Sequence, residues 1–298
     1  MPKSILCVGG AVVDRTYLCA TEPSLGTSNP VTSRRSFGGV ARNVAETLAR
    51  LGARVQFISA IGTGGAGLDL AASLIAAGVD ISGLLTVPDQ PTAEYIAAFW
   101  QGELFAGFAD MAIFDALTPQ ALAARLPAGL GQMLLFADCN LPAATLAMLT
   151  ARAKSDGICL TLDAVSLAKS ERPPTDLSAV SVLFLNTAQC RHLGGIQTVR
   201  ARGPGAVVLT QGRDGVMLYQ GAGSQHLPAP SVAVVNVSGA GDALIAGTLL
   251  GLAEDRPLVA AVALGLAAAA LALQNIAAVP AGLSRAALDG EVARQSRP

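Results

Sequence analysis

Residues 232–247, with the sequence VAVVNVSGAGDALIAG, hold the pattern from which the rest of the chain is interpreted. The β-branched run Val232–Val237 predicts a strand that enters the middle of the fold. Ser238 is a candidate helix cap, and Gly239 and Gly241 let the backbone come close to a ligand at a helix start. Because the first N–H groups of a helix lack internal partners and lie at the positive end of its dipole, this segment predicts an anion site.

Asp242 places a carboxylate directly after the predicted anion site. A carboxylate there would repel a phosphate unless it acts as a base or faces a metal ion, so its position indicates a catalytic role. An acidic residue in the first turn also stabilises an ordinary helix through the helix dipole. The Gly-Ala-Gly-Asp sequence alone gives these two interpretations about equal weight, and the rest of the chain has to decide between them.

The composition indicates a globular protein with a large apolar core. Of the 298 residues, 52% are hydrophobic, 14% are charged and 4% are aromatic, and the net charge is −1. This balance predicts binding to neither nucleic acid nor a membrane surface, and the few aromatic residues argue against a base-stacking RNA platform. The five cysteines are scattered without a C-x-x-C pair, which predicts reduced thiols rather than disulfides or a zinc site.

No secretory or membrane-spanning segment is expected. The apolar run in the N-terminal sequence MPKSILCVGG is too short for a signal peptide. The longest uncharged run, Leu258–Leu273, has about 16 residues, whereas a membrane span needs ~20, so a buried core helix is the better interpretation. Without an internal repeat or linker, residues 1–298 are predicted to form one domain of a cytoplasmic protein.

Short apolar strands alternate with helical segments along the chain, which predicts an α/β fold with an open parallel sheet. The predicted strands are Ser4–Val8, Val55–Ile61, Met133–Ala137, Ile158–Leu162, Val182–Leu185 and Ala206–Thr210. Polar residues recur just after such strands, at Asp14, Asp138, Asn140, Asp163 and Asn186. Because the carboxyl ends of parallel strands share one edge of a sheet, where ligands bind, these residues predict a polar rim around a site.

Two excursions from this alternation, at roughly residues 15–37 and 84–108, predict a small β-sheet lid over the site. The first excursion turns at a bend rich in Gly, Ser, Asn and Pro around Ser28–Pro30. In the second, Gln101-Gly102 provides a hairpin turn. The short runs of alternating polarity in the second excursion are Leu84–Val87, Ala93–Trp100 and Glu103–Phe108.

Gly38-Gly39 opens a predicted helix that ends at Gly52, with apolar residues at helical spacing. Asn43, one turn into this helix, is expected to point toward the same space as the glycine pair, and the alternative is a solvated helix amide. A second glycine-containing turn, Gln211–Gly215, follows the last predicted parallel strand and allows a nucleotide to approach.

Three stretches of the chain resemble the ribokinase-like (PfkB) family of sugar and nucleoside kinases: GGAVVD at 9–14, SFGGVARNVAETLARLG at 36–52 and VNVSGAGD at 235–242. They occur in the family's order, and the resemblance covers essentially the whole chain. It implies a three-layer α/β/α fold with a mostly parallel central sheet and a small β-sheet lid. It also implies that Asp242 is the catalytic base and that Gly239, Ala240 and Gly241 form the anion hole.

The resemblance further implies a set of binding residues and cofactors. Acceptor-binding residues are expected at Asp14, Asn29, Gly38, Gly39, Asn43 and Asn140. ATP-binding residues are expected at Asn186, Thr210, Gly212, Gly215 and Asn275. The expected cofactors are ATP and Mg²⁺, together with a monovalent cation such as K⁺. The expected partners are a small nucleoside or sugar and a second copy of the chain, bound through the β lid as a homodimer, with no nucleic acid and no membrane.

Within the family, the chain is most similar to the pseudouridine kinases. The supporting details are SNP at 28–30, GVARN at 39–43, ADCN at 137–140 and Asn236, where most sugar kinases of the family carry aspartate. One position departs from the family, because its N-x-x-E motif, linked to magnesium, appears here as Asn186-Thr187-Ala188-Gln189. Gln189 is therefore interpreted as an outer-shell metal residue or, alternatively, as a helix residue that faces solvent.

The expected function is ATP-dependent phosphorylation of the 5′-hydroxyl of pseudouridine. In this mechanism Asp242 removes the hydroxyl proton, the amides of Gly239–Gly241 stabilise the developing charge, and Mg²⁺ bridges the ATP phosphates. One alternative is a ribokinase- or fructokinase-like enzyme that acts on a free sugar. The other is a non-catalytic nucleotide- or sugar-binding sensor, against which Asp242 argues because a sensor needs no base.

Overall fold

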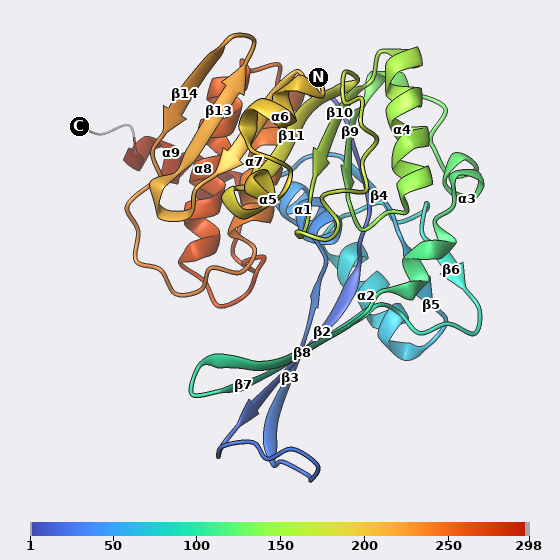
Figure 1. The fold of residues 1–298 in the computed structure, drawn as a ribbon, viewed down its shortest axis with the longest axis vertical. Coiled ribbons are helices and arrows are strands. Elements are labelled where there is room, and N and C mark those ends of the chain that lie inside the picture. The colour runs from blue at the N-terminus through green and yellow to red at the C-terminus, as the bar shows by residue number, and fades with distance from the viewer. Residues whose placement is uncertain (1, 296–298) are drawn as a thin grey trace.

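The computed structural model describes residues 2–295 and arranges them as a large sheet with helices on both faces and a smaller sheet that projects from one end (Figure 1). The large sheet has the strand order β14-β13-β12-β11-β10-β9-β1-β4. The pairings from β4 to β12 are parallel, and β13 and β14 add an antiparallel edge. The strands are β1 (Ile5–Val8), β4 (Val55–Ile58), β9 (Leu134–Asp138), β10 (Cys159–Asp163), β11 (Val180–Asn186), β12 (Ala206–Thr210), β13 (Val216–Gln220) and β14 (Gly223–Leu227).

Two apolar layers hold the helices against this sheet, which confirms the predicted α/β/α architecture. Successive side chains leave opposite faces of a strand, so Ile5 and Cys7 of β1 join one layer and Leu6 and Val8 join the other. Burial on both faces explains why such strands are continuous apolar runs in the sequence. The first layer packs against α1 (Val40–Arg50), α2 (Gly65–Ala76), α7 (Ala240–Ala253), α8 (Leu258–Leu273) and α9 (Arg285–Gln295). The second packs against α3 (Pro119–Ala123), α4 (Ala143–Asp156), α5 (Thr187–His192) and α6 (Ile196–Ala201).

Helix α8 has the bounds that the uncharged run Leu258–Leu273 predicts, and most of its residues are buried. It packs along α7, the helix that follows the Gly-Ala-Gly-Asp segment. Within residues 2–295, none of the helices combines the length and the apolarity that crossing a membrane requires.

The predicted small β sheet is confirmed: it has four strands in the order β3-β2-β7-β8 and extends as an arm from the body of the molecule (Figure 1). Its strands are β2 (Val12–Cys19), β3 (Val31–Gly38), β7 (Glu94–Trp100) and β8 (Glu103–Asp110). The assignment of Leu84–Val87 to this lid is wrong. β6 (Leu85–Val87) instead pairs in parallel with β5 (Ala60–Gly62), because the Leu85 N–H donates to Ser59 O and both Leu85 and Val87 pack on the core.

The prediction of a strand at Val232–Val237 is also wrong. These residues form no strand, and Val234, Val235 and Val237 are 59%, 58% and 73% exposed. The β13–β14 hairpin already occupies the sheet edge beside β12, so the segment that follows it runs outside the sheet. The backbone N–H groups of Val235 and Asn236 donate to Leu273 O at the end of α8 rather than to a strand. The local β preference of the valines is therefore overridden by the lack of a partner.

Candidate active site

The start of α7 is the candidate anion site. Gly239 precedes the helix with φ 79°, in the left-handed region that favours glycine. A Cβ at this position would lie 2.3 Å from the carbonyl oxygen of Ala278, so the loop after α8 approaches the glycine closely. The prediction that Ser238 caps the helix is wrong, since Gly239 is the N-cap and the Ser238 N–H donates to Asn236 Oδ1 at 3.0 Å. A helix start without a side-chain cap leaves its N–H groups available to an anion.

Asp242 lies in the first turn of α7 and is joined to Asn43 on α1. Asn43 Nδ2 donates to Asp242 Oδ2 at 2.8 Å, although the two residues are 199 positions apart. The solvated-amide alternative for Asn43 is wrong because its side chain is buried. Burial raises the pKa of Asp242 to about 6, with Asp138 and Asp14 adding to the rise and the Asn43 hydrogen bond and the Arg42 charge opposing it. A carboxylate with this pKa is mostly ionised at neutral pH and can accept a proton.

Asp14 and the glycine pair form a second wall of this site. A Cβ at Gly38 would lie 2.1 Å from Asp14 Oδ2, and a Cβ at Gly39 would lie 2.4 Å from Gly10 O. Because Gly38 and Gly39 have no side chains, the start of α1 can pack against the loop after β1. Burial raises the pKa of Asp14 to about 6, and the charge of Arg42 opposes this rise.

Asp138 belongs to the predicted polar rim but is fully buried. Its carboxylate accepts hydrogen bonds from the backbone N–H groups of Gly10 (3.0 Å), Ala41 (2.9 Å) and Asn140 (2.9 Å). Burial raises its pKa, although these hydrogen bonds oppose the rise. Asp138 thus ties together the loop after β1, the start of α1 and the end of β9, which carry Gly10, Asn43 and Asn140.

Asn140 has a cationic partner that the sequence interpretation missed. Lys169, in the loop after β10, donates from Nζ to Asn140 Oδ1 at 2.5 Å. Arg172 holds this loop in place, because its Nη1 donates to the carbonyl oxygens of Asn140 (2.9 Å) and Cys139 (3.1 Å). Burial lowers the pKa of Lys169, against the attraction of Asp138. The position of Lys169 could have indicated that it belongs to the site, because it follows a strand that ends in Asp163, at the sheet edge where ligands bind in such folds.

Asp163 pairs in register with Asp138 on the neighbouring strand. Its Oδ2 accepts a hydrogen bond from the Val165 N–H at 2.8 Å. Burial raises the pKa of Asp163 to about 8, and the charges of Asp242 and Asp138 add to the rise. The carboxyl group of Asp163 is therefore protonated near neutral pH and contributes little negative charge to the site.

The expected ATP-side residues lie in three places: at the ends of two neighbouring strands, in the turn after β12, and just after α8. Asn186 and Thr210 are register partners at the ends of β11 and β12. Gly212 and Gly215 lie in and after the short turn Gly212–Asp214 that follows β12. Asn275 lies just after α8, where its Nδ2 donates to Leu271 O at 2.8 Å. The loop after Asn275 contains Ala278, which contacts Gly239, so this residue lies on the segment that borders the anion site.

Gln189 is part of a helix cap, and the alternative that it faces solvent is wrong because it is 4% exposed. Its Oε1 accepts a hydrogen bond from the Asn186 N–H at 2.8 Å, and the Gln189 N–H donates to Asn186 Oδ1 at 2.9 Å. This reciprocal pair is a capping box at the start of α5. Across residues 2–295, moreover, no three or more His, Cys, Asp or Glu side chains gather in a way that could hold a metal ion. The described residues therefore do not form a metal cage of their own.

Asn29 is the expected acceptor residue that the structure keeps apart from the others. It lies in the loop between β2 and β3, at the far end of the lid (Figure 1). Its Oδ1 accepts from the Ser24 N–H at 2.8 Å, and its Nδ2 donates to Ser24 O at 2.9 Å. Asn29 thus closes the loop at the tip of the lid.

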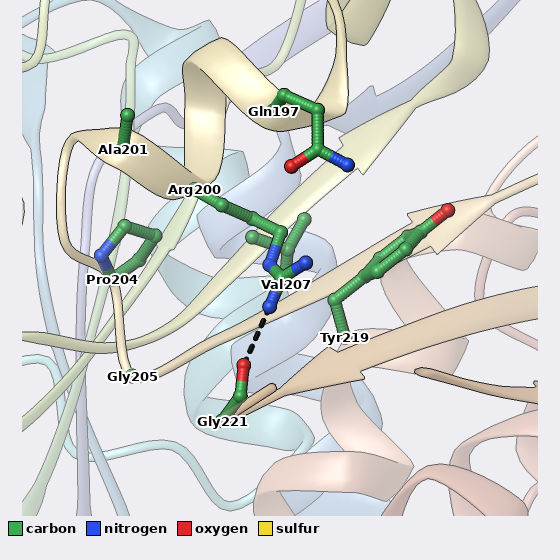
Figure 2. Close-up of a pocket in the computed structure, with 8 residues that line it drawn as sticks. All are labelled: Gln197, Arg200, Ala201, Pro204, Gly205, Val207, Tyr219 and Gly221. Atoms are coloured by element: carbon green, nitrogen blue, oxygen red, sulfur yellow. Dashed lines mark hydrogen bonds between the residues drawn. The ribbon is translucent and has the colours of Figure 1, made fainter. Parts of the chain in front are cut away.

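A cavity of about 400 Å³ lies away from these residues, between α6 and β13 (Figure 2). Arg200 spans it, donating from Nη2 to Gly221 O at 2.5 Å with its guanidinium carbon 5.7 Å from the centre of the Tyr219 ring. The residues that line this cavity include none of the predicted site residues. It is therefore a surface feature separate from the candidate active site.

The three-layer α/β fold with its smaller, projecting β sheet is the ribokinase-like fold. The sequence model described as pfkB family carbohydrate kinase matches residues 2–282, and the chain belongs to this family. It is therefore an ATP-dependent phosphotransferase with the ribokinase-like fold.

Three known proteins illustrate the relationship. The pseudouridine kinase of Escherichia coli (strain K12) is 29% identical over 257 residues, which cover 82% of either chain. A carbohydrate kinase from Agrobacterium tumefaciens is 32% identical in sequence, with a TM-score of 0.87 over 98% of this chain and 97% of the other. The Arabidopsis thaliana ribokinase, solved in complex with ribose and ATP, has a TM-score of 0.85 at 19% identity over 98% of this chain and 99% of the other, a likeness of fold alone.

Proposed function

We propose that this chain is a nucleoside kinase that transfers the γ-phosphoryl group of ATP to the 5′-hydroxyl of pseudouridine. The observation that carries the proposal is the Asn43–Asp242 hydrogen bond. It joins the start of α1, which lies beside Asp14, to the start of α7, which is the candidate anion site. An alcohol bound on the Asp14 side would thereby meet a base and an anion site together. Phosphoryl transfer needs this juxtaposition, because most of the catalysis comes from positioning and electrostatic stabilisation.

Each part of this site has a role in the proposed reaction. Asp242 uses Oδ2 to accept the Asn43 hydrogen bond, and Oδ1 is left to accept the proton of the acceptor hydroxyl. The N–H groups at the start of α7, in Gly239–Gly241, stabilise the charge that develops on the transferred phosphoryl group. Asp14 and Asn43 hold the ribose hydroxyls. Mg²⁺ bound to ATP would shield the charge of the phosphates, and the ATP phosphates rather than a protein cage would hold it.

The Lys169–Asn140 pair supports a nucleoside over a free sugar. Asn140 lies against Gly10, so close that a Cβ on the glycine would be 2.5 Å from Asn140 Nδ2, and Gly10 also contacts Gly39. The Lys169–Asn140 pair therefore borders the part of the site that contains Asp14 and the glycine pair. It adds a cationic donor and an amide to that part of the site. A pyrimidine base offers carbonyl oxygens and ring N–H groups to such partners, whereas free ribose offers hydroxyls alone. The similarity to the E. coli pseudouridine kinase adds independent support.

On the other side of the anion site, exposed apolar residues support the docking of the ATP base. Val235, Val237 and Ile276 are 58%, 73% and 73% exposed. Asn236 holds their two segments together, because its Nδ2 donates to Ile276 O at 2.7 Å. Apolar groups gathered in solvent beside a phosphate site favour a stacked heterocycle.

The lid supports the further proposal of a homodimer. Its strand β8 lies at the edge of the small sheet and exposes Leu104, Phe105 and Phe108. An exposed edge strand with large apolar side chains is a template for pairing with another chain. Light scattering of the wild type and of Phe108→Glu tests this proposal. We expect the wild type to be a dimer and Phe108→Glu to be a monomer. A monomeric wild type would contradict the proposal.

A phosphorylation panel tests the proposed function. ATP is supplied with pseudouridine, uridine, adenosine, inosine, ribose or fructose, and product formation is followed by ³¹P NMR. The proposal predicts that pseudouridine has the highest kcat/KM. A higher value for ribose or fructose would replace it with a sugar kinase. ATP binding without turnover of any acceptor would favour the alternative of a non-catalytic nucleotide- or sugar-binding sensor.

A further inference from the structure

Arg42 is a buried cation beside the partner of the proposed base. Its Nη1 donates both to Phe37 O and to Asn43 Oδ1, each at 3.0 Å, and its guanidinium forms an ion pair with Glu46 one turn along α1. The guanidinium also lies over the Phe37 ring, 5.9 Å from its centre. Arg42 is only 5% exposed, and burying a charge is costly unless it is fully paired. Its location therefore calls for a role besides the stability of α1.

The contacts of Arg42 decide how the Asn43 amide is oriented. A guanidinium carries only hydrogen-bond donors, and an ionised carboxylate carries only acceptors. Asn43 lies between the two, with Oδ1 on Arg42 and Nδ2 on Asp242. A rotated amide would set its NH₂ group against the guanidinium and its oxygen against the carboxylate. Arg42 and Asp242 therefore jointly select one of the two amide orientations.

We propose that Arg42 is a positioning residue for phosphoryl transfer: its guanidinium fixes the Asn43 amide so that Nδ2 stays on Asp242 and the other carboxylate oxygen faces the acceptor. This inference rests on the proposed role of Asp242 as the base. Arg42 acts through Asn43 and not by contact with the reacting atoms.

The charges around Asp242 give Arg42 a second influence on the base. Asp14 on β2 and Asp138 on β9 are the carboxylates that raise the pKa of Asp242, and Arg42 is the cation that opposes them. Asp163 on β10 also interacts with Asp242, but its own pKa is raised to about 8. Arg42 also lowers the pKa of Asp14, whereas Lys169 interacts with Asp138. Loss of Arg42 therefore leaves Asp242 with a looser hydrogen bond and without its opposing charge, and both changes raise the pKa of Asp242.

Arg50 provides a matched control for Arg42. Both arginines pair with Glu46, and Arg50 bonds Glu46 Oε1 through Nε (2.9 Å) and Nη2 (2.7 Å). Its Nη1 donates to Ala281 O at 3.1 Å, and none of its recorded contacts is to Asn43 or Asp242. Arg42→Met and Arg50→Met therefore each remove one partner of Glu46, but only Arg42→Met frees the Asn43 amide.

The first experiment measures the pKa of Asp242 by NMR of ¹³C-carboxyl-labelled aspartate, which needs no turnover. Arg42→Met is expected to raise this pKa by about one unit, and Arg50→Met to leave it unchanged. An unchanged pKa in Arg42→Met, or an equal rise in both variants, would overturn the proposal. Because the enzyme need not turn over, this readout separates a failure of the Arg42 inference from a failure of the proposed function.

The second experiment is a double-mutant cycle on kcat with the acceptor that the enzyme phosphorylates fastest. Arg42→Met is expected to lower kcat by about 10–100-fold with little change in the KM for ATP. In an Asn43→Ala background the same change should cost less than about threefold, because the residue through which Arg42 acts is absent. Effects that multiply in the double variant would show that Arg42 does not act through Asn43 and would overturn the proposal. If Arg42→Met does not fold, Arg42→Lys is tested in the same cycle, since a lysine keeps the positive charge but lacks the planar fork that holds Asn43 and Glu46 through two separate nitrogens.

Discussion

Replacing Gly239 by alanine should damage the anion site and the stability of the protein together. The new Cβ would lie 2.3 Å from Ala278 O, so the loop after α8 would have to move. A non-glycine residue in the left-handed region at φ 79° costs about 1–2 kcal/mol in addition. We expect a free energy of unfolding lower by at least about 2 kcal/mol and a raised KM for ATP, because the displaced loop carries Asn275 and Ile276.

Gly241→Ala is the matched control in the same segment. A Cβ at Gly241 meets no atom within 4 Å, and the residue lies inside α7. Alanine in a helix is favoured over glycine by roughly 0.5–1 kcal/mol, so the free energy of unfolding should rise slightly. The two variants should therefore differ by at least about 2.5 kcal/mol in urea denaturation followed by circular dichroism. Equal denaturation midpoints for Gly239→Ala and Gly241→Ala would refute the close contact between Gly239 and Ala278.

Three further predictions concern the acceptor, the pH profile and magnesium. Asp14→Ala should raise the acceptor KM by about 10–100-fold, as loss of a charge-assisted hydrogen bond in a closed site does, and should leave the KM for ATP unchanged; equal weakening of both substrates would make Asp14 structural. The ratio kcat/KM should rise with pH through about 6, because Asp242 and Asp14 both have pKa values raised to about 6 and the base must lose its proton; a flat profile from pH 5 to 8 would contradict this. Gln189→Glu should keep the capping box, since glutamate also accepts from the Asn186 N–H, and should lower the free Mg²⁺ needed for half-maximal rate; a titration identical to that of the wild type would place Gln189 outside the metal shell.

Much of the fold could be predicted from the sequence because the relevant signals are local. The strand at Ile5–Val8 is a continuous apolar run because both its faces are buried, and the run Leu258–Leu273 predicts α8 with its observed bounds. The glycines at the starts of α1 and α7 likewise identify where another backbone segment approaches closely. These features depend on burial and backbone shape, which single residues and short patterns record.

The errors arise where the structure depends on which segments pair with each other rather than on local preference. Val232–Val237 has strong β preference, but the β13–β14 hairpin occupies the sheet edge, and no local pattern records that competition. The segment Leu84–Val87 likewise has the local pattern of a strand, but that pattern does not show that its partner is β5 rather than a strand of the lid.

The unforeseen contacts of the site are also long-range. Lys169 meets Asn140 across 29 residues, and Asn43 meets Asp242 across 199. Positions after strand ends predict which residues gather at the site edge, but only the packed structure decides which of them are bonded to each other.

The proposed role of Asp242 as the base of a pseudouridine kinase is tested by a comparison of two proteins. Wild type and Asp242→Asn are assayed with ATP and pseudouridine, with ATP binding measured separately by calorimetry. We expect pseudouridine 5′-phosphate as the wild-type product and a kcat lower by about 10²–10⁴-fold in Asp242→Asn, with the affinity for ATP nearly unchanged. Near wild-type turnover by Asp242→Asn would instead show that this carboxylate is not the base.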